Sequence, residues 1–260
     1  MRVFSKLRNK GKTMKKISIF SDDRRFSYAK ELFSEKGYEC SLNDFSSLSG
    51  ADALVLSVAP TDTEEKLSSV LSHLNPGATV FTGNAHTVKK LFCGKTVAYS
   101  DSEAFLLRNA YITALCAIRL TFEKVDSLLL GKRALVMGYG RIGKYLSSML
   151  RSLGADVFIY ARSRKNREDA VLNGMKPVEI SDVPNLCLDA VYNTVPNIII
   201  DKSASDILYG KALIMELASL PGGFEDGSIA FKASGLPGKM MPRAAAEAVC
   251  DLVLSVLSEE

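Results

Sequence analysis

The sequence has few histidines, no paired cysteines and no long apolar run, and each shortage excludes a class of protein. The chain has 260 residues, of which 47% are hydrophobic and 24% charged. Nowhere does it approach the roughly 18 consecutive apolar residues that a membrane helix needs. Its five cysteines show no paired spacing, which is typical of reduced thiols in the cytoplasm rather than a disulfide framework. There are only two histidines, His73 and His86, and no metal site is indicated.

The net charge of +4 comes from the beginning of the chain. Residues 1–16 hold seven of the 33 Lys and Arg and no acid, so the remainder has 33 − 7 = 26 basic against 29 acidic residues, a net charge of −3. This slightly negative net charge does not indicate nucleic-acid binding. The basic leader lacks the apolar core of a secretory signal, and we expect residues 1–13 to be a disordered extension.

Alternating strand and helix patterns predict an α/β protein with two doubly wound parallel-sheet domains. Residues 14–100 are typical of a small flavodoxin-like domain. Residues 101–127 predict a bridging helix with a stripe of small apolar residues, and residues 128–242 predict a Rossmann dinucleotide-binding domain. We expect the last helix, residues 243–257, to pack back on the first domain. The expected strands are residues 15–20, 38–42, 53–58, 78–81 and 96–99, then 134–137, 156–160, 177–180, 189–193 and 212–217, with a short one near 229–231.

One glycine-rich turn organises the second domain. An apolar strand leads directly into Gly138-Tyr-Gly140-Arg-Ile-Gly143, and an amphipathic helix follows. Gly138 permits a sharp exit from the strand, Gly140 lets a pyrophosphate approach bare backbone, and Gly143 lets the helix lie close to the sheet. The start of a helix also offers free N–H groups to an anion. The pattern predicts a dinucleotide site, with a purely structural tight turn as the alternative. Its predicted cofactor contacts are Gly138, Gly140, Arg141, Ile142 and Gly143.

The end of the following strand indicates which dinucleotide binds. NAD-binding chains usually place Asp or Glu there, about 20 residues after the glycines, to hold the ribose 2′-hydroxyl. Here the strand ends in Tyr160-Ala161-Arg162-Ser163, and the first acid is Glu168. Because guanidinium pairs with phosphate through two charged hydrogen bonds, this end suits a 2′-phosphate. We therefore expect Ala161, Arg162 and Ser163 to bind NADP, with NAD possible; a solvated basic loop is the alternative.

Three loops of the second domain are rich in glycine, proline and small polar residues. In a doubly wound sheet, ligands bind beyond the carboxyl ends of the strands, and Gly and Pro hold loops there in fixed shapes. Each loop alone is compatible with a rigid turn, but the three together favour a functional site. The loops are Tyr192-Asn-Thr-Val-Pro196, Glu216-Leu-Ala-Ser-Leu-Pro-Gly-Gly223, and Gly235-Leu-Pro-Gly-Lys239 with Pro242 and Arg243.

These loops, in order with the glycine turn and the Ala161-Arg162 strand end, resemble the A subunit of bacterial dipicolinate synthase. The resemblance implies a two-domain dehydrogenase, similar in build to the formate/glycerate dehydrogenases, that oxidises dihydrodipicolinate to dipicolinate with NADP. It also implies a small dicarboxylate substrate, a role in endospore formation and a flavoprotein-like second subunit. The cofactor contacts expected in the loops are Asn193, Thr194, Val195, Pro196, Glu216 and Ala218.

The sequence departs from the family's pattern in three places. The family's Gly-Gly-Asp-x-Arg turn is Ser21-Asp-Asp-Arg-Arg25 here. Its bridging-helix segment, typically Ala-x-Pro-Thr-Ala-Glu-Gly-Ala, reads Ala110-Tyr-Ile-Thr-Ala-Leu-Cys-Ala117, so Leu115 replaces the acid. A later Pro-Lys-Thr-Ala-Gly stretch has become Pro242-Arg-Ala-Ala-Ala246. These changes indicate a divergent member with altered substrate or lost activity.

The chemistry requires alignment of a C–H bond with the nicotinamide, a base for one proton, and cations for the substrate carboxylates. The candidate cations are Arg25, Lys239 and Arg243. Asp23 either orients Arg25 or acts as the base, although a plain surface turn is equally compatible. Histidine is poorly supported, because no histidine follows His86. That argues against a D-2-hydroxy-acid dehydrogenase, which typically uses a histidine from the C-terminal half. The predicted catalytic residues are Asp23, Arg25, Thr113 and Ser219, and the predicted substrate-binding residues are Lys239 and Arg243.

Three functions stay compatible with these residues. The favoured one is a dipicolinate-synthase-like NADP oxidoreductase of the cytoplasm. A different small-molecule NADP dehydrogenase of the same build is the second. The third is a cofactor-holding scaffold without activity, for which Leu115 is the hint. We expect a flavoprotein-like partner subunit, and neither nucleic acid nor a membrane as a partner. A homo-oligomer is also compatible with the sequence.

Overall fold

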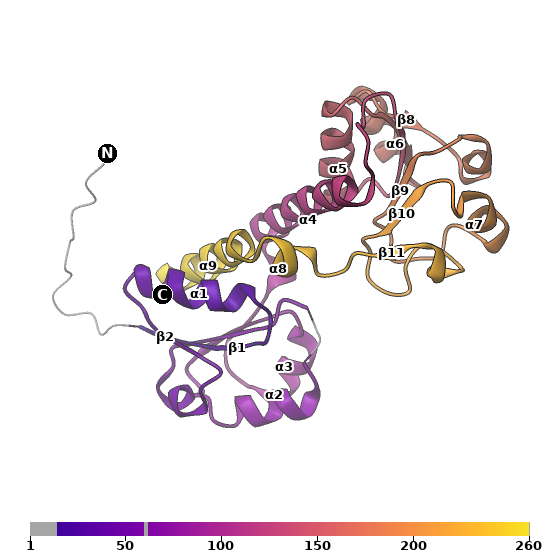
Figure 1. Cartoon of the computed structure of the whole chain (residues 1–260). Helices are drawn as coiled ribbons and strands as arrows, with labels where there is room; N and C mark the ends of the chain where they lie inside the picture. The colour runs from indigo at the N-terminus through magenta and orange to yellow at the C-terminus, as the bar shows by residue number, and fades with distance from the viewer. Residues whose placement is uncertain (1–14, 60–61, 260) are drawn as a thin grey trace, which may run out of the picture. The chain divides into compact units, whose positions relative to one another are not determined.

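The computed structural model describes residues 15–59 and 62–259, which form two compact α/β units (Figure 1). The first unit comprises the described residues up to Ser102 together with those from Val249 onward, and the second comprises Glu103–Ala248. Each unit is built on one parallel sheet. The predicted fold class, two doubly wound parallel-sheet domains, is confirmed. The basic extension predicted at residues 1–13 lies outside the described residues.

The first sheet has the strand order β2-β1-β3-β4-β5, which is the flavodoxin-like order. Its strands β3 and β4 are fully buried, because helices cover both faces of the sheet. Figure 1 shows α1 on one face and α2 and α3 on the other. The elements are β1 (Lys16–Phe20), α1 (Arg25–Glu35), β2 (Glu39–Leu42), η1 (Phe45–Gly50), β3 (Ala53–Leu56), α2 (Glu64–Leu71), β4 (Thr79–Thr82), α3 (Ala85–Leu91), β5 (Thr96–Ala98) and η2 (Tyr99–Asp101).

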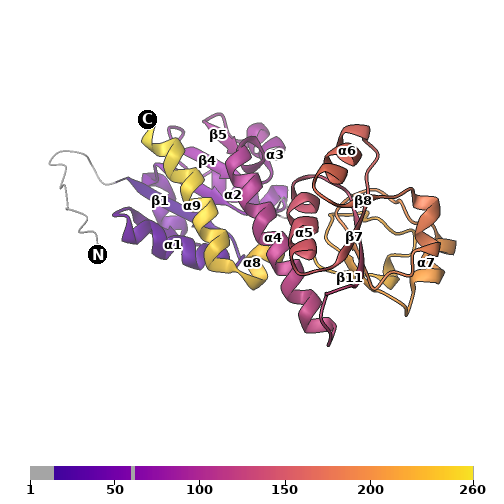
Figure 2. The same ribbon diagram turned by 90° about the horizontal axis from the view of Figure 1, so that it is seen from above.

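The last helix, α9 (Pro242–Ser258), lies beside α1 against the first sheet, as both views show (Figure 2). The thiol of Cys250 donates to the carbonyl of Ala29 at 3.8 Å, and Nζ of Lys15 donates to the carbonyl of Leu257 at 2.7 Å. Val253 is fully buried in the same unit. The end of the chain therefore contributes to the core of the unit that the beginning of the chain forms.

The second sheet has the strand order β11-β10-β9-β6-β7-β8, in which the order reverses between β6 and β9. The helices α4, α5 and α6 cover one face, and α7 with η3 covers the other (Figure 2). The elements are α4 (Glu103–Lys124), β6 (Arg133–Met137), α5 (Arg141–Ser152), β7 (Asp156–Tyr160), α6 (Arg164–Leu172), β8 (Lys176–Pro177), η3 (Ile180–Asn185), β9 (Ala190–Asn193), α7 (Lys202–Leu208), β10 (Leu213–Glu216), η4 (Gly227–Ile229), β11 (Phe231–Lys232) and α8 (Leu236–Met240).

The long helix α4 buries a stripe of small residues against the second unit's core. Ala110, Ala114 and Ala117 are each at most 4% exposed, and short side chains let neighbouring helices approach closely. By length and composition alone α4 could cross a membrane, but half of its most apolar window is buried inside the protein. The core helix of a soluble protein passes the same test, so this is weak evidence for a membrane span.

Two segments differ from the sequence prediction. The strand expected at residues 177–180 is the short β8, followed by the 3-10 helix η3. Pro177 has no N–H for a strand ladder, which limits its pairing. The loop predicted from Gly235 to Lys239 instead contains the short helix α8. Gly235 adopts a left-handed conformation with φ of 67°, and Pro237 lies in the first turn, where its missing N–H is tolerated.

Candidate functional site

A cavity of about 520 Å³ opens at the carboxyl ends of β6, β7 and β9 in the second unit. It lies where the strand order reverses, which is where doubly wound sheets bind their ligands. Its walls come from α4, the glycine turn, the turn between β7 and α6, and the loop after β9. The predicted cofactor contacts that line this cavity are Gly138, Gly140, Arg141, Ile142, Ala161, Arg162, Ser163, Thr194, Val195 and Pro196.

The first and third glycines of the turn have no space for a side chain, whereas the second does. Gly138 leaves β6 with φ of 98°, and a Cβ there would collide with the hydroxyl of Thr194. A Cβ at Gly143 would collide with the carbonyl of Gly138, so glycine lets α5 lie against the end of the strand. A Cβ at Gly140 would meet no heavy atom within 4 Å. The turn therefore leaves room at Gly140 for a ligand to approach the backbone.

The first turn of α5 presents uncapped N–H groups. Gly140 is the N-cap, no side chain accepts a hydrogen bond from the first turn, and that turn contains no acid. Because the first N–H groups of a helix have no partner within it, they and the helix dipole give a partial positive charge. This end of the helix borders the cavity through Arg141 and Ile142. An anionic group such as a pyrophosphate fits this electrostatic environment.

Arg141 lines the cavity, but its guanidinium is paired with Glu103 at the start of α4. Nε of Arg141 donates to Oε1 of Glu103 at 2.9 Å, and Nη2 donates to Oε2 at 2.6 Å. The hydrogen bond from Arg141 lowers the pKa of the Glu103 carboxyl below its usual range. Both side chains are about half exposed, so solvent screens the pair. Glu103 could not be predicted as a partner, since nothing in the sequence near the glycine turn indicates an acid on a separate helix.

The turn between β7 and α6 forms the second wall of the cavity. Arg162 and Ser163 line it, and none of the described residues that line this cavity is acidic. Within the part of the chain that the structure describes, the Arg162 guanidinium has no ion pair, whereas Arg164 pairs with Glu168 at 2.7 Å. The wall therefore presents an available cation where an NAD-binding protein usually has a carboxylate.

Two residues of α6 that the sequence analysis did not select also shape this wall. Nη1 of Arg167 donates to the carbonyl of Ala161 at 2.9 Å and to that of Arg162 at 3.0 Å, which holds the turn in place. Asn166 lines the cavity directly. It comes three residues after Ser163 at the start of a helix, and that spacing is the signal that could have identified it.

Three predicted cofactor contacts brace the loops and are not among the residues lining this cavity. Nδ2 of the fully buried Asn193 donates to the carbonyl of Val195 at 2.8 Å and to Oε1 of Glu216 at 2.7 Å. The Glu216 carboxylate also accepts from the backbone N–H of Ala218 at 2.9 Å and of Gly223 at 2.8 Å. A carboxylate with these N–H donors is well satisfied. These contacts place Thr194 and Val195 against the glycine turn, so the network supports the cavity indirectly.

The two hydroxyl residues predicted to be catalytic occupy different environments. Ser219 lines a separate, smaller cavity of about 140 Å³, together with Leu220 and Pro221. Thr113 is buried in α4, and its hydroxyl donates to the carbonyl of Asn109 at 2.8 Å. Asn109 lines the larger cavity, whereas Thr113 itself does not. The Thr113 hydroxyl can therefore accept a further hydrogen bond but has no second proton to donate.

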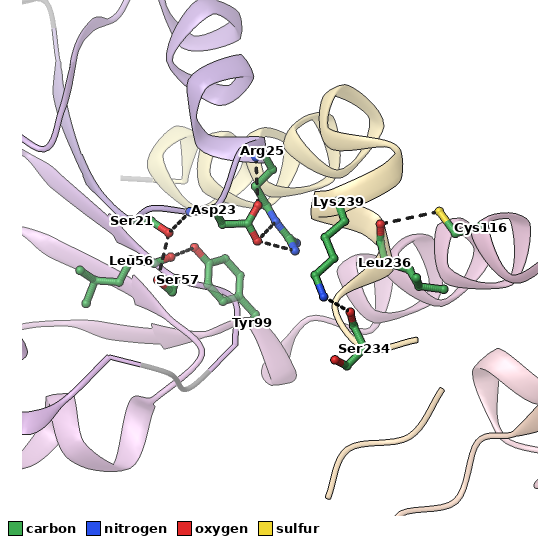
Figure 3. Close-up of polar contacts among 10 residues, drawn as sticks. All are labelled: Ser21, Asp23, Arg25, Leu56, Ser57, Tyr99, Cys116, Ser234, Leu236 and Lys239. Carbon is green, nitrogen blue, oxygen red and sulfur yellow. Dashed lines mark hydrogen bonds and ion pairs between the residues drawn. The ribbon is translucent and has the colours of Figure 1, made fainter. Parts of the chain in front are cut away.

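Both predicted substrate cations of the second unit are exposed and have partners. Nζ of Lys239 donates to the carbonyl of Ser234 at 2.8 Å (Figure 3). Nε of Arg243 lies 4.0 Å from Oε1 of Glu247, one turn further along α9. This distance is at the limit of an ion pair, so Arg243 remains free to reorient toward an anion.

Asp23 and Arg25 lie in the first unit, directly after β1 (Figure 3). Nε of Arg25 donates to Oδ2 of Asp23 at 3.0 Å, Nη2 lies 2.9 Å from the same oxygen, and the backbone N–H of Arg25 donates to Oδ1 at 3.0 Å. The backbone N–H of Asp23 donates to Oγ of Ser21 at 3.3 Å. Both carboxylate oxygens of Asp23 are therefore engaged, which favours its predicted role in orienting Arg25 over a role as base.

Part of the second unit matches a known domain family. Residues 121–198 match the family described as D-isomer specific 2-hydroxyacid dehydrogenase, NAD binding domain. The matched segment contains the glycine turn, β7 and the loop after β9. The dipicolinate synthase A subunit of Bacillus subtilis (strain 168) is 25% identical over 232 residues, which cover 80% of this chain and 78% of the relative. The resemblance to the dipicolinate synthase A subunit is confirmed.

Solved structures show the same fold. The dipicolinate synthase A subunit from Bacillus halodurans superposes with a TM-score of 0.80 at 22% identity, covering 95% of this chain and 98% of the other. A transhydrogenase from Sinorhizobium meliloti superposes with a TM-score of 0.69 at 15% identity, covering 92% and 94% of the two chains. The match to the dehydrogenase domain family and the 25% identical relative support an oxidoreductase that has a nicotinamide-binding domain of the dehydrogenase type.

Proposed function

We propose that this chain is an NADP-dependent oxidoreductase subunit that oxidises dihydrodipicolinate to dipicolinate. The observation on which this rests is the cavity at the strand-order reversal of the second unit, with its open glycine turn and uncapped helix. The nicotinamide of such a cofactor accepts a hydride. The chain's own residues bind the dinucleotide, hold it in one orientation and position the substrate.

NADP is proposed over NAD because of the charge at the end of β7. A 2′-phosphate requires cations and hydrogen-bond donors, and Arg162 and Ser163 supply them in the wall of the cavity. Arg167 holds the backbone of this turn, so the position of Arg162 is defined before a ligand binds. A carboxylate that would favour a free 2′-hydroxyl is not among the described residues of this wall.

A dihydropyridine dicarboxylate fits as substrate because its oxidation yields an aromatic ring and because the chain offers cations for its carboxylates. In the second unit we assign substrate binding to Lys239 and Arg243, which are exposed and held by weak or single contacts. The hydroxyls of Thr113 and Ser219 stay proposed catalytic groups, Ser219 from the wall of its own cavity.

The partner and the setting of the reaction are also proposals. The Bacillus subtilis relative is by name one component of a larger enzyme, dipicolinate synthase. By analogy we propose a flavoprotein-like second subunit for this chain. A cytoplasmic location and a role in endospore formation follow from the same analogy, and the free cysteines of the chain fit a reducing compartment.

Turnover is the direct test of this proposal. The purified chain, with and without its candidate flavoprotein-like subunit, is mixed with freshly formed dihydrodipicolinate and NADP, and NADPH and dipicolinate are measured. We expect NADP-dependent formation of dipicolinate that increases when the second subunit is present, and no turnover of D-2-hydroxy acids. Tight dinucleotide binding without turnover of any substrate would instead support a scaffold that has lost its activity.

A further inference from the structure

The first unit contains a buried cation that its surroundings do not fully satisfy. Arg25 is 4% exposed, and a guanidinium carries five N–H donors. Nε and Nη2 both reach a single oxygen, Oδ2 of Asp23. Nη1 is buried and has no hydrogen-bond partner among the described residues. An unpaired buried donor on a charged group is costly, and a bound anion is one arrangement that would satisfy it.

The position of Arg25 in the fold points to ligand binding. The first sheet reverses its strand order between β1 and β3, and ligands of doubly wound sheets bind outside the carboxyl ends of the strands at that point. Arg25 follows β1 as the first residue of α1. Beside it, Oγ of Ser21 after β1 lies 2.9 Å from Oγ of Ser57 after β3. The Tyr99 hydroxyl donates to the carbonyl of Leu56 in the same cluster (Figure 3).

Asp23 fixes the orientation of this cation. Its Oδ2 holds Nε and Nη2 of Arg25, and its Oδ1 holds the backbone N–H of the same residue. Side chain and backbone are thus tied to one carboxylate, which prevents the guanidinium from rotating. A cation held in its binding orientation before the ligand arrives loses less entropy when it binds. The Nη1 edge is the one left facing away from Asp23.

We propose that the Nη1 edge of Arg25 is a carboxylate-binding site of the first unit, with Asp23 as its positioning residue. The site rests on the proposed function for the identity of the ligand, one carboxylate of a pyridine dicarboxylate. Charge favours a carboxylate over a phosphate dianion, because Asp23 already offsets the single positive charge of Arg25. A planar carboxylate also matches the planar guanidinium. It follows that Asp23 is not the base of the reaction, since both its oxygens are committed to Arg25.

Calorimetric titration of the full chain with pyridine-2,6-dicarboxylate tests this site. We expect Arg25→Lys, which keeps the charge but loses the planar group, to weaken binding at least tenfold. Asp23→Asn keeps the shape but weakens the hold on Arg25, and a severalfold loss is expected. Arg24→Lys is the matched control, since Arg24 is exposed next to the site, and it should bind as the parent does. NADP affinity should be unchanged in all three variants.

A second readout needs no variant and therefore no assumption about folding. The side-chain N–H resonances of Arg25 in the parent chain should shift on addition of the dicarboxylate and not on addition of inorganic phosphate at the same concentration. Unshifted resonances, a parent chain that does not bind the dicarboxylate, or an Arg25→Lys chain that binds it like the parent would each overturn the site. Turnover of dihydrodipicolinate alongside any of these results would leave the proposed function standing and remove only the Arg25 site.

Discussion

The two units place chemically opposite turns at equivalent points of their sheets. In the second unit, the turn after β6 is rich in glycine, and the helix that follows it begins with backbone N–H groups that no side chain caps. In the first unit, the turn after β1 contains no glycine, and side chains occupy the same place: Ser21 and Asp23 support Arg25. Both turns adjoin the strand-order reversal of their sheets.

The two turns suit two different kinds of ligand. A bare glycine turn lets a bulky pyrophosphate lie against the backbone, and its donors come from the fold itself. A turn whose side chains support an arginine instead holds one planar cation in a fixed orientation. We infer that the turn after β6 binds the dinucleotide, whereas the turn after β1 supplies a cation for one carboxylate.

The largest effect is expected when a side chain is added at the third glycine of the turn. In Gly143→Ala, the new methyl group would collide with the Gly138 carbonyl, so α5 must move away from the sheet. We expect a loss of stability of about 1–3 kcal/mol, which is typical of an overpacked core, and loss of measurable dinucleotide binding. Thermal unfolding and calorimetry measure the two effects. A variant as stable as the parent would show that the close approach of α5 is not needed.

A smaller and cleaner effect is expected at the open glycine. In Gly140→Ala, the methyl group meets no protein atom, and the backbone φ of −83° is accessible to alanine. The melting temperature should therefore fall only slightly, by the cost of alanine at an N-cap, while NADP binding weakens about tenfold, or 1.4 kcal/mol, because the methyl group occupies the path of the pyrophosphate. Unchanged affinity would mean that the ligand does not approach the backbone at this glycine.

A smaller effect on NADP affinity is expected from Arg167, whose hydrogen bonds hold the β7–α6 turn in place. In Arg167→Lys, the ammonium cannot reproduce the two hydrogen bonds from Nη1 to the carbonyls of Ala161 and Arg162. We expect NADP affinity to fall about threefold to tenfold, and NAD affinity to change little, since each lost hydrogen bond contributes about 0.5–1.5 kcal/mol. Arg164→Lys, on the exposed side of the same helix, is the control and should leave the preference for NADP unaltered.

The smallest effect is expected from the acid that pairs with Arg141. Glu103→Gln removes the carboxylate that engages the Arg141 guanidinium at the rim of the cavity. The freed cation should raise dinucleotide affinity about twofold, because exposed ion pairs are weak. The gain should shrink at high salt, as expected for a screened interaction. A decrease in affinity would show that Glu103 orients Arg141 for the ligand instead of competing with it.

The parts of the site that could be predicted from the sequence are those whose residues are neighbours in the chain. Gly138, Gly140 and Gly143 have fixed spacing after an apolar strand, and Arg162 ends the next strand, so pattern alone assigns them to one sheet edge. The two sheets could likewise be predicted, because short apolar runs alternate with helical segments.

The parts that could not be predicted depend on contacts between distant segments. Glu103 meets Arg141 across 38 positions of the chain, and Glu216 meets Asn193 across 23. Both carboxylates are ordinary acids in the sequence, and only the packing of α4 on α5 and of β10 beside β9 gives them partners. Glu216 was predicted as a ligand contact, which stays a prediction, and only the structure reveals that its carboxylate also braces two loops. The unsatisfied Nη1 of Arg25 is also invisible without the fold.

The central claim is that the second unit selects NADP through the cation at the end of β7, and one calorimetric experiment tests it most directly. NADP and NAD are titrated into the parent chain and into Arg162→Ala under the same salt conditions. The account predicts that the parent binds NADP more tightly than NAD, and that the variant loses about 1.5–3 kcal/mol of NADP affinity, the value of a charge-assisted hydrogen bond, with NAD affinity unchanged. Equal affinity for both dinucleotides in the parent, unaltered in Arg162→Ala, would contradict it.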